Sequence, residues 1–123
     1  MRVIKKILIV EDELLIAKVL RMQLEKLDYS VDNVVDGVQA MERVSTMSPD
    51  LIILDNFLKN NTNGIEVALE LRSKANETPI IFVTGNSFVT TVENTRNVTN
   101  SFVLSKPIIF EQLLELIDQI KNV

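Results

Sequence analysis

The sequence contains no cysteine and no histidine. The missing cysteines exclude disulfide frameworks, thiolate metal sites and cysteine nucleophiles. The missing histidines remove the commonest general base and the commonest transition-metal ligand. Basic residues are fewer than acidic ones, 13 against 17, which gives a net charge of −4 and argues against direct binding of nucleic acid. Any metal site in this chain must therefore be built from oxygen ligands, which suit a hard cation.

Long apolar runs and export signals are missing as well. No run reaches the roughly 18 apolar residues that a membrane-spanning helix needs. The opening segment, Met1–Lys6, is too short and becomes charged too soon for a signal peptide. With 123 residues, 46% of them hydrophobic, the chain is long enough for one domain with one core. We therefore expect a single cytoplasmic domain over residues 1–123, without a membrane partner.

Short apolar runs alternate with helical patterns along the chain. Continuously apolar runs rich in branched side chains are typical of strands buried on both faces of a parallel sheet. Three such runs are Ile7–Val10, Leu51–Leu54 and Ile80–Val83. Two further strands are expected at 29–35, which is more polar and therefore nearer an edge, and at 102–104.

Apolar residues at helical spacing follow each expected strand. In the first helical segment the core-facing positions are expected at Ile16, Leu20, Leu24 and Leu27. The segment 86–100 is rich in β-branched residues and asparagine, so we expect its helix to be short or mobile. Helices are predicted over 14–27, 37–47, 64–74, 86–100 and 109–120. Five strand–helix repeats predict a doubly wound α/β sandwich, (βα)5.

Polar residues follow the strands at their carboxyl ends, where ligands bind in open α/β sheets. These residues are Glu11, Asp12, Asp55, Thr84 and Lys106. Clustered carboxylates repel one another and favour a cation, and Mg²⁺ fits an oxygen-only ligand set. An aspartate beside Mg²⁺ is a nucleophile toward a phosphoryl group, whose other oxygens an ammonium and a hydroxyl can hold. The pattern indicates phosphoryl transfer to Asp55.

Each of these residues also has an explanation without chemistry. Glu11 and Asp12 are typical acids of a helix N-terminus. Asp55 can begin a turn, and Lys106–Pro107 can open the last helix. The functional interpretation depends on their joint presence at successive strand ends.

With these residues the chain resembles the receiver domain of two-component response regulators, the chemotaxis receiver among them. The resemblance is carried by the pair Glu11–Asp12, by Asp55 after its apolar run, by Thr84–Gly85 and by Lys106–Pro107. It implies a flavodoxin-like fold with a five-stranded parallel sheet in the order 2-1-3-4-5.

The resemblance also implies a role for each site residue. Asp55 would accept a phosphoryl group, and Thr84 and Lys106 would bind its oxygens. Asp12 would ligate Mg²⁺ directly and Glu11 through a water molecule, while Asp55 and the backbone carbonyl of Phe57 would complete the protein ligands. The Lys106–Pro107 peptide bond would be cis.

The implied partners are proteins. A sensor histidine kinase or a histidine phosphotransfer protein would donate the phosphoryl group, and an output domain, a downstream protein or a second copy of the chain would receive the signal. The chain would be a regulator rather than an enzyme. It is either a stand-alone regulator or the front part of a longer one.

Some positions depart from the family pattern. Lys59 stands where a proline is usual, and Gly64 comes nine residues after Asp55, one more than usual. The position of the family's switch aromatic is Val103, with Phe102 one residue earlier. We therefore expect the phosphoryl chemistry to be retained and the signalling face to be atypical.

Three other functions are compatible with an α/β sandwich of this size. A flavin-binding domain of the same fold needs hydroxyl or glycine-rich donors after the first strand, where this chain has acids. A phosphatase with an aspartyl nucleophile usually has a second acid two residues later, where this chain has Phe57. A pseudo-receiver that acts only as a protein-interaction module stays the alternative.

Overall fold

The computed structural model describes residues 2–58, 63–85 and 93–123. In these residues five parallel strands form one sheet in the order β2-β1-β3-β4-β5, the order that the resemblance implied. The strands are β1 (Lys6–Val10), β2 (Ser30–Val34), β3 (Leu51–Asp55), β4 (Ile80–Thr84) and β5 (Ser101–Ser105). The three continuously apolar runs lie in β1, β3 and β4, which occupy the centre of the sheet and are almost wholly buried.

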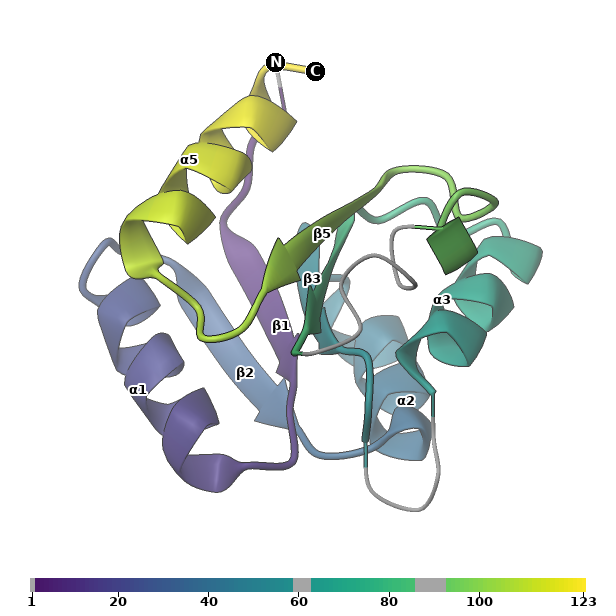
Figure 1. The fold of residues 1–123 in the computed structure, drawn as a ribbon, viewed down its shortest axis with the longest axis horizontal. Helices are drawn as coiled ribbons and strands as arrows, with labels where there is room; N and C mark the ends of the chain where they lie inside the picture. The colour runs from purple at the N-terminus through teal and green to yellow at the C-terminus, as the bar shows by residue number, and fades with distance from the viewer. Residues whose placement is uncertain (1, 59–62, 86–92) are drawn as a thin grey trace.

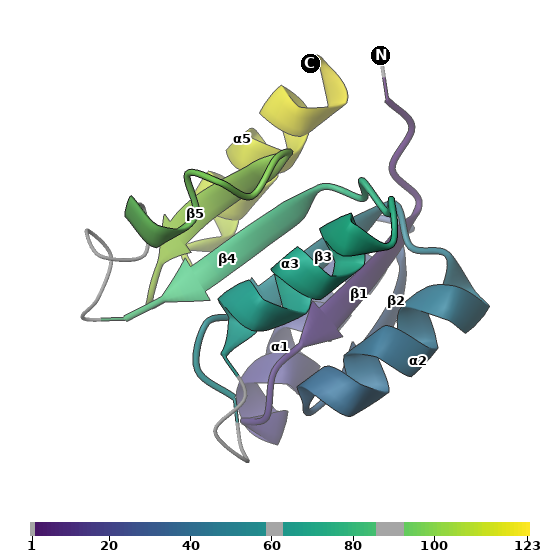
Figure 2. The same cartoon turned by 90° about the vertical axis from the view of Figure 1, so that its right-hand side faces the viewer.

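Helices cover both faces of the sheet (Figures 1 and 2). They are α1 (Leu14–Glu25), α2 (Gly37–Met47), α3 (Gly64–Ser73) and α5 (Phe110–Lys121). Helices α1 and α5 pack on one face, and α2 and α3 pack on the other. Two of them have side-chain caps that satisfy a free backbone N–H of the first turn. Asp36 accepts from Gln39 N at the start of α2, and Asn63 accepts from Ile65 N at the start of α3.

The hydrophobic core is divided by the sheet into two layers, because side chains of a strand alternate between its faces. Ile7 and Ile9 of β1 face α1 and α5, whereas Leu8 and Val10 face α2 and α3. Phe82, the largest of the fully buried side chains, belongs to the α2–α3 layer.

The buried stripe of α1 differs from the predicted one. The helix buries Ala17, Leu20 and Leu24, whereas Ile16 and Leu27 are 41% and 49% exposed. Leu27 lies beyond the end of the helix, which stops at Glu25. Ile16 lies beside the stripe, because consecutive residues of a helix point about 100° apart. In the other helices the apolar residues at helical spacing pack into the core as predicted, among them Ala40 and Val44 of α2, Val67 and Leu71 of α3, and Leu113 and Ile117 of α5.

The fourth helix, expected within 86–100, lies partly outside the described residues. The described part, 93–100, is mostly turn, and its Val98 packs into the α2–α3 layer. No helix in the described parts of the chain has the length and apolar character to cross a membrane.

Candidate functional site

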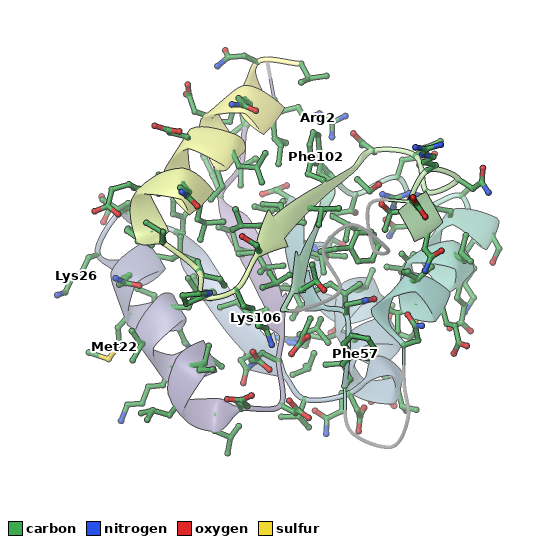
Figure 3. The ribbon with its side chains drawn as sticks, in the orientation of Figure 1. Arg2, Met22, Lys26, Phe57, Phe102 and Lys106 are labelled. Atoms are coloured by element: carbon green, nitrogen blue, oxygen red, sulfur yellow. The ribbon has the colours of Figure 1, made fainter. Side chains whose placement is uncertain are left out.

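The carboxyl ends of the central strands bring distant parts of the sequence to one edge. Val10, the last residue of β1, pairs in register with Leu54 of β3, and Leu54 pairs with Phe82 of β4. Thr84, which ends β4, pairs with Ser105, which ends β5. Residues that follow these strands therefore emerge side by side. Figure 3 shows Lys106 and Phe57 at this edge of the sheet.

Three carboxylates form the centre of the site. One oxygen each of Glu11, Asp12 and Asp55 lie within 4.8 Å of one another. Glu11 and Asp55 are only 6% and 5% exposed, and Asp12 is half-buried. The prediction that these acids meet is thus confirmed by the geometry.

Lys106 is the cation beside this cluster. Its Nζ donates to Asp55 Oδ2 at 2.9 Å and lies 3.9 Å from Glu11 Oε1. Burial opposes the charge of Lys106, but the hydrogen bond and attraction to Asp55 outweigh it, so the pKa of Lys106 is raised. The Lys106–Pro107 peptide bond is cis, as the resemblance implied.

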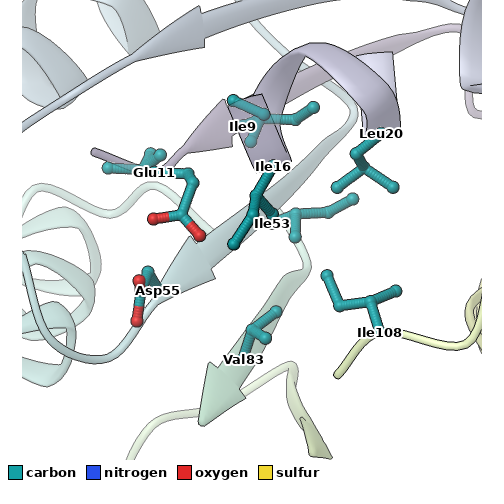
Figure 4. Close-up of a pocket in the computed structure, with 10 residues that line it drawn as sticks. Ile9, Glu11, Ile16, Leu20, Ile53, Asp55, Val83 and Ile108 are labelled. Carbon is teal, nitrogen blue, oxygen red and sulfur yellow. The ribbon is translucent and has the colours of Figure 1, made fainter. Parts of the chain in front are cut away.

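The ionisation of Glu11 is strongly altered by its surroundings. Apolar side chains, among them Ile9, Ile53 and Val83, line the small space next to the Glu11 and Asp55 carboxyl groups (Figure 4). Burial there, followed by the hydrogen bond with Asp55, raises the pKa of Glu11 from 4.5 to about 7. In the described part of the chain Lys106 is the basic side chain paired with these acids, and its single charge does not neutralise three carboxylates, so the site favours either a proton or a cation.

Such a site fits a hard divalent cation. Its donors are carboxylate oxygens, which Mg²⁺ prefers, and the chain has no histidine or cysteine to favour a softer metal. The raised pKa of Glu11, which comes from burial first and from the neighbouring Asp55 second, is consistent with a buried acid that binds either a proton or a cation.

The two remaining predicted residues also lie at this edge. Thr84 is wholly buried. Its backbone carbonyl accepts a hydrogen bond from Lys106 N at 2.7 Å, which connects the end of β4 to the segment that follows β5. Phe57 N donates to Asp55 Oδ1 at 3.0 Å, while the Phe57 side chain is 63% exposed. Both oxygens of Asp55 thus have a fixed donor.

The backbone around Asp55 is held by the start of α3. Gly64 N donates to Asn56 O at 3.0 Å, and Phe57 forms an isolated antiparallel bridge with Asn63. A Cβ on Gly64 would lie 2.7 Å from Asp55 O and 3.1 Å from Asn56 Cα. Position 64 therefore requires glycine because a side chain would not fit there, and not because the backbone has a positive φ. The intervening residues 59–62, including Lys59, lie outside the described part.

A polar side chain of β2 reaches the same region. Asn33 Nδ2 donates to Ile9 O at 3.1 Å, to Val34 O at 3.1 Å and to Glu11 O at 3.4 Å. Sequence reasoning missed this residue. The available signal was an Asp32–Asn33 pair in the middle of a strand, where both residue types are unusual.

An apolar groove of about 610 Å³ opens next to the acidic cluster. It lies between α1 and the segment after β5, and Glu11 and Lys106 form part of its wall. Its apolar lining consists of Leu15, Ile16, Val19, Leu20, Pro107 and Ile108. The exposed position of Ile16 is therefore part of a surface feature beside the site.

Comparison with known proteins gives one consistent result. The family description "response regulator receiver domain" matches residues 7–118. The chain is 42% identical over 82 residues to the response regulator ArlR of Staphylococcus saprophyticus, covering 67% of this chain and 36% of that protein. It is 31% identical over 109 residues to the response regulator MprA of Mycobacterium avium, covering 89% of this chain and 47% of that protein. The chain thus spans between about a third and a half of the length of these curated relatives.

Solved structures agree in fold. The receiver domain of NtrX from Brucella abortus matches with a TM-score of 0.85 at 21% identity, covering 95% of this chain and 98% of that one. The receiver domain of the Francisella response regulator 1452 matches with a TM-score of 0.85 at 22% identity, covering 96% and 97%. At this level of identity the likeness concerns the fold alone.

Proposed function

Because the chain belongs to the family of response regulator receiver domains, we propose that it is a phosphoacceptor signalling domain in which Asp55 accepts a phosphoryl group with the help of Mg²⁺. The observation that carries this proposal is the contact of Asp55 with Lys106 at 2.9 Å inside a cluster of three carboxylates. A nucleophile, a cation for the phosphoryl oxygens and a metal-binding set then occupy one edge of the sheet.

In the proposed reaction a carboxylate oxygen of Asp55 attacks phosphorus. A P–O bond forms, the P–N bond of a phosphohistidine breaks, and its electron pair leaves with the imidazole nitrogen. Mg²⁺, bound by Asp12, Asp55 and the Phe57 carbonyl and through water by Glu11, would neutralise phosphoryl charge. Lys106 already lies at the nucleophile and would pair with a transferred phosphoryl oxygen.

The remaining residues hold the acceptor in place. The Phe57 N–H fixes Asp55 Oδ1, so the carboxylate is oriented before the donor arrives. Thr84 would bind a phosphoryl oxygen from the end of β4. Its backbone link to Lys106 would couple that event to the β5 end of the sheet.

The apolar groove supports a protein as the phosphoryl donor. It shares Glu11 and Lys106 with the acidic cluster, so a partner seated in it would bring its own side chains next to Asp55. Leu15 and Val19 are 75% and 50% exposed on its rim and offer apolar contact area. We assign this groove to a donor that carries a phosphohistidine, such as a histidine kinase or a histidine phosphotransfer protein.

The proposal extends to the organisation of the signalling pathway. Residues 1–123 would form one receiver domain that works in the cytoplasm and acts on an output domain, a downstream protein or a second copy of the chain. Its chemistry would be self-phosphorylation from a donor rather than turnover of a substrate.

Intact-mass analysis after incubation with acetyl phosphate, with and without Mg²⁺, tests the proposal. We expect one added phosphoryl group that depends on Mg²⁺ and is lost in Asp55→Asn. Asp28→Asn is the matched control, because Asp28 is exposed and its φ of 69° is one that asparagine also adopts.

Addition that persists in Asp55→Asn would refute the assignment of the acceptor. No addition under any condition, together with no binding of Mg²⁺, would refute the proposed function and favour a pseudo-receiver that works through protein contacts alone.

A further inference from the structure

Asn33 connects the edge strand β2 to the point where β1 ends and the acidic loop begins. Its side-chain amide donates to the carbonyl oxygens of Ile9 and Val34 at 3.1 Å and of Glu11 at 3.4 Å. Ile9 is its register partner in β1, and Glu11 is the first residue after that strand. The amide therefore links β2 to the end of β1 and to Glu11, the first of the acids.

The peptide groups of Glu11 are held from two sides. Glu11 N donates to Val34 O at 3.0 Å, and Glu11 O accepts from Asn33. The direction of the Glu11 carbonyl fixes the plane of the peptide that leads into Asp12. Asn33 thus constrains the direction in which the Asp12 side chain leaves the backbone.

Electrostatics makes such a constraint necessary. Without a cation, the ionised carboxylates of Glu11, Asp12 and Asp55, which lie within 4.8 Å of one another, repel one another, and an opening of the loop after β1 would relieve this repulsion. Each net hydrogen bond contributes about 1 kcal/mol, which corresponds to about fivefold in an equilibrium constant. The bonds of Asn33 oppose opening of the loop by an amount of this order.

We propose that Asn33 is a positioning residue that preorganises Glu11 and Asp12 for Mg²⁺ by holding the backbone carbonyls at the exit of β1. This inference rests on the proposed function of the site. It also accounts for an asparagine in a strand, where a β-branched residue has the higher propensity.

The neighbouring residue provides a matched control. Asp32 lies one position earlier in β2 and is equally half-buried, but its carboxylate pairs with Arg43 of α2. Asp32→Asn weakens a contact of the same strand without removing a bond to the loop after β1. Asn33→Val removes all three amide bonds and keeps, or improves, strand propensity.

The dissociation constant of Mg²⁺ is measured by calorimetry for the wild type, Asn33→Val, Asn33→Ala and Asp32→Asn. We expect binding about five- to tenfold weaker in both Asn33 variants and unchanged within twofold in Asp32→Asn. In the metal-free protein the ¹³C′ resonance of Glu11 should shift in the Asn33 variants, because its carbonyl loses a donor. Urea unfolding of each variant shows which of them are folded.

Several outcomes overturn the inference. Wild-type Mg²⁺ affinity in folded Asn33→Val would do so, and so would equal weakening in Asp32→Asn. If the wild type binds no Mg²⁺, this inference and the metal dependence in the proposed function fail together. If Mg²⁺ binds with the expected Asn33 effect but Asp55 is never phosphorylated, the proposed function fails and the role of Asn33 stands.

Discussion

Glu11 is the single residue whose ionisation most directly reports the state of the site. Its carboxyl group is buried and shares a hydrogen bond with Asp55, and its pKa is raised to about 7. The protonated form is therefore favoured in the folded protein relative to the unfolded chain. A proton and a divalent cation compete for the same carboxyl group.

This competition predicts the pH dependence of Mg²⁺ binding. The affinity should weaken as pH falls below about 7, by up to about tenfold per pH unit. The stability of the metal-free protein should depend on pH in the opposite direction. Ionising Glu11 costs more in the folded protein, so this residue's contribution to the free energy of unfolding falls as pH rises from 4.5 to about 7.

Glu11→Gln, which mimics the protonated form, checks both statements. Its metal-free free energy of unfolding, measured in urea, should exceed that of the wild type increasingly between pH 5 and pH 8, and its Mg²⁺ affinity should lose most of its pH dependence. Glu42→Gln on the exposed face of α2 is the control. A constant difference between Glu11→Gln and the wild type over this pH range would contradict the raised pKa.

The sequence was enough to predict the site residues that lie at the ends of strands. Asp55 and Lys106 were predicted to meet because the carboxyl ends of parallel strands share one edge, and they lie 2.9 Å apart. Asn33 was missed because its side chain contacts backbone carbonyls, including those of Ile9 in β1 and of Glu11 in the loop after β1. Such a contact depends on strand register, which no local pattern in β2 specifies.

Among the elements, the start of α3 lies directly against the backbone of the acceptor. A methyl group at position 64 would meet backbone atoms of Asp55 and Asn56, which cannot move aside as a flexible side chain can. Gly64→Ala should therefore displace α3 or the end of β3. We expect a loss of about 1–3 kcal/mol in the free energy of unfolding and slower phosphorylation of Asp55.

Gly85→Ala is the matched control for stability. Among the described residues nothing lies within 4 Å of a Cβ built at Gly85, so we expect its free energy of unfolding to stay within about 0.5 kcal/mol of the wild type. Urea unfolding of both variants decides the point. Equal stability of the two alanine variants would show that the end of β3 tolerates the added methyl group.

Helix α1 lines the apolar groove beside the acidic cluster with Leu15, Ile16, Val19 and Leu20. If a donor protein occupies the groove, Leu15→Glu should reduce phosphotransfer from that donor about tenfold or more relative to phosphorylation by acetyl phosphate, because a charge replaces apolar contact area. Val38→Glu on α2 is the control, since Val38 and Leu15 are both 75% exposed. Equal loss in both variants would exclude a specific role of the groove.

Hydrophobic periodicity predicted where the helices and strands lie better than it predicted which of their residues face the core. The predicted stripe of α1 was wrong at Ile16, where the neighbouring Ala17 is buried instead, and at Leu27, which lies beyond the end of the helix. In β5, Phe102 packs with the α1–α5 layer and Val103 with the α2–α3 layer. Phe102 therefore cannot replace an aromatic residue at position 103, since adjacent strand residues point to opposite faces.

For the whole molecule, the decisive property is that the charged residues of the site come from three strand ends at once. Glu11 and Asp12 follow β1, Asp55 ends β3, and Lys106 follows β5. The three acids are close only in the folded chain, so their repulsion is a cost of folding and a bound cation is a gain. The predicted strand order was enough to predict that these residues converge. Residues 86–92, where most of the expected fourth helix would lie, are outside the part of the chain that the structure describes.

Asp12→Asn should therefore change stability in opposite directions with and without Mg²⁺. Without metal, removal of one of three clustered charges should raise the free energy of unfolding by about 1 kcal/mol. With Mg²⁺ at about 100 times its dissociation constant, the wild type should gain about 2.7 kcal/mol and the variant much less, so their order reverses. Urea unfolding in EDTA and in Mg²⁺, at ionic strength matched with NaCl, measures both values. Parallel gains in the two proteins would place the cation away from Asp12, because only a metal held by this carboxylate makes its removal stabilising in one condition and destabilising in the other.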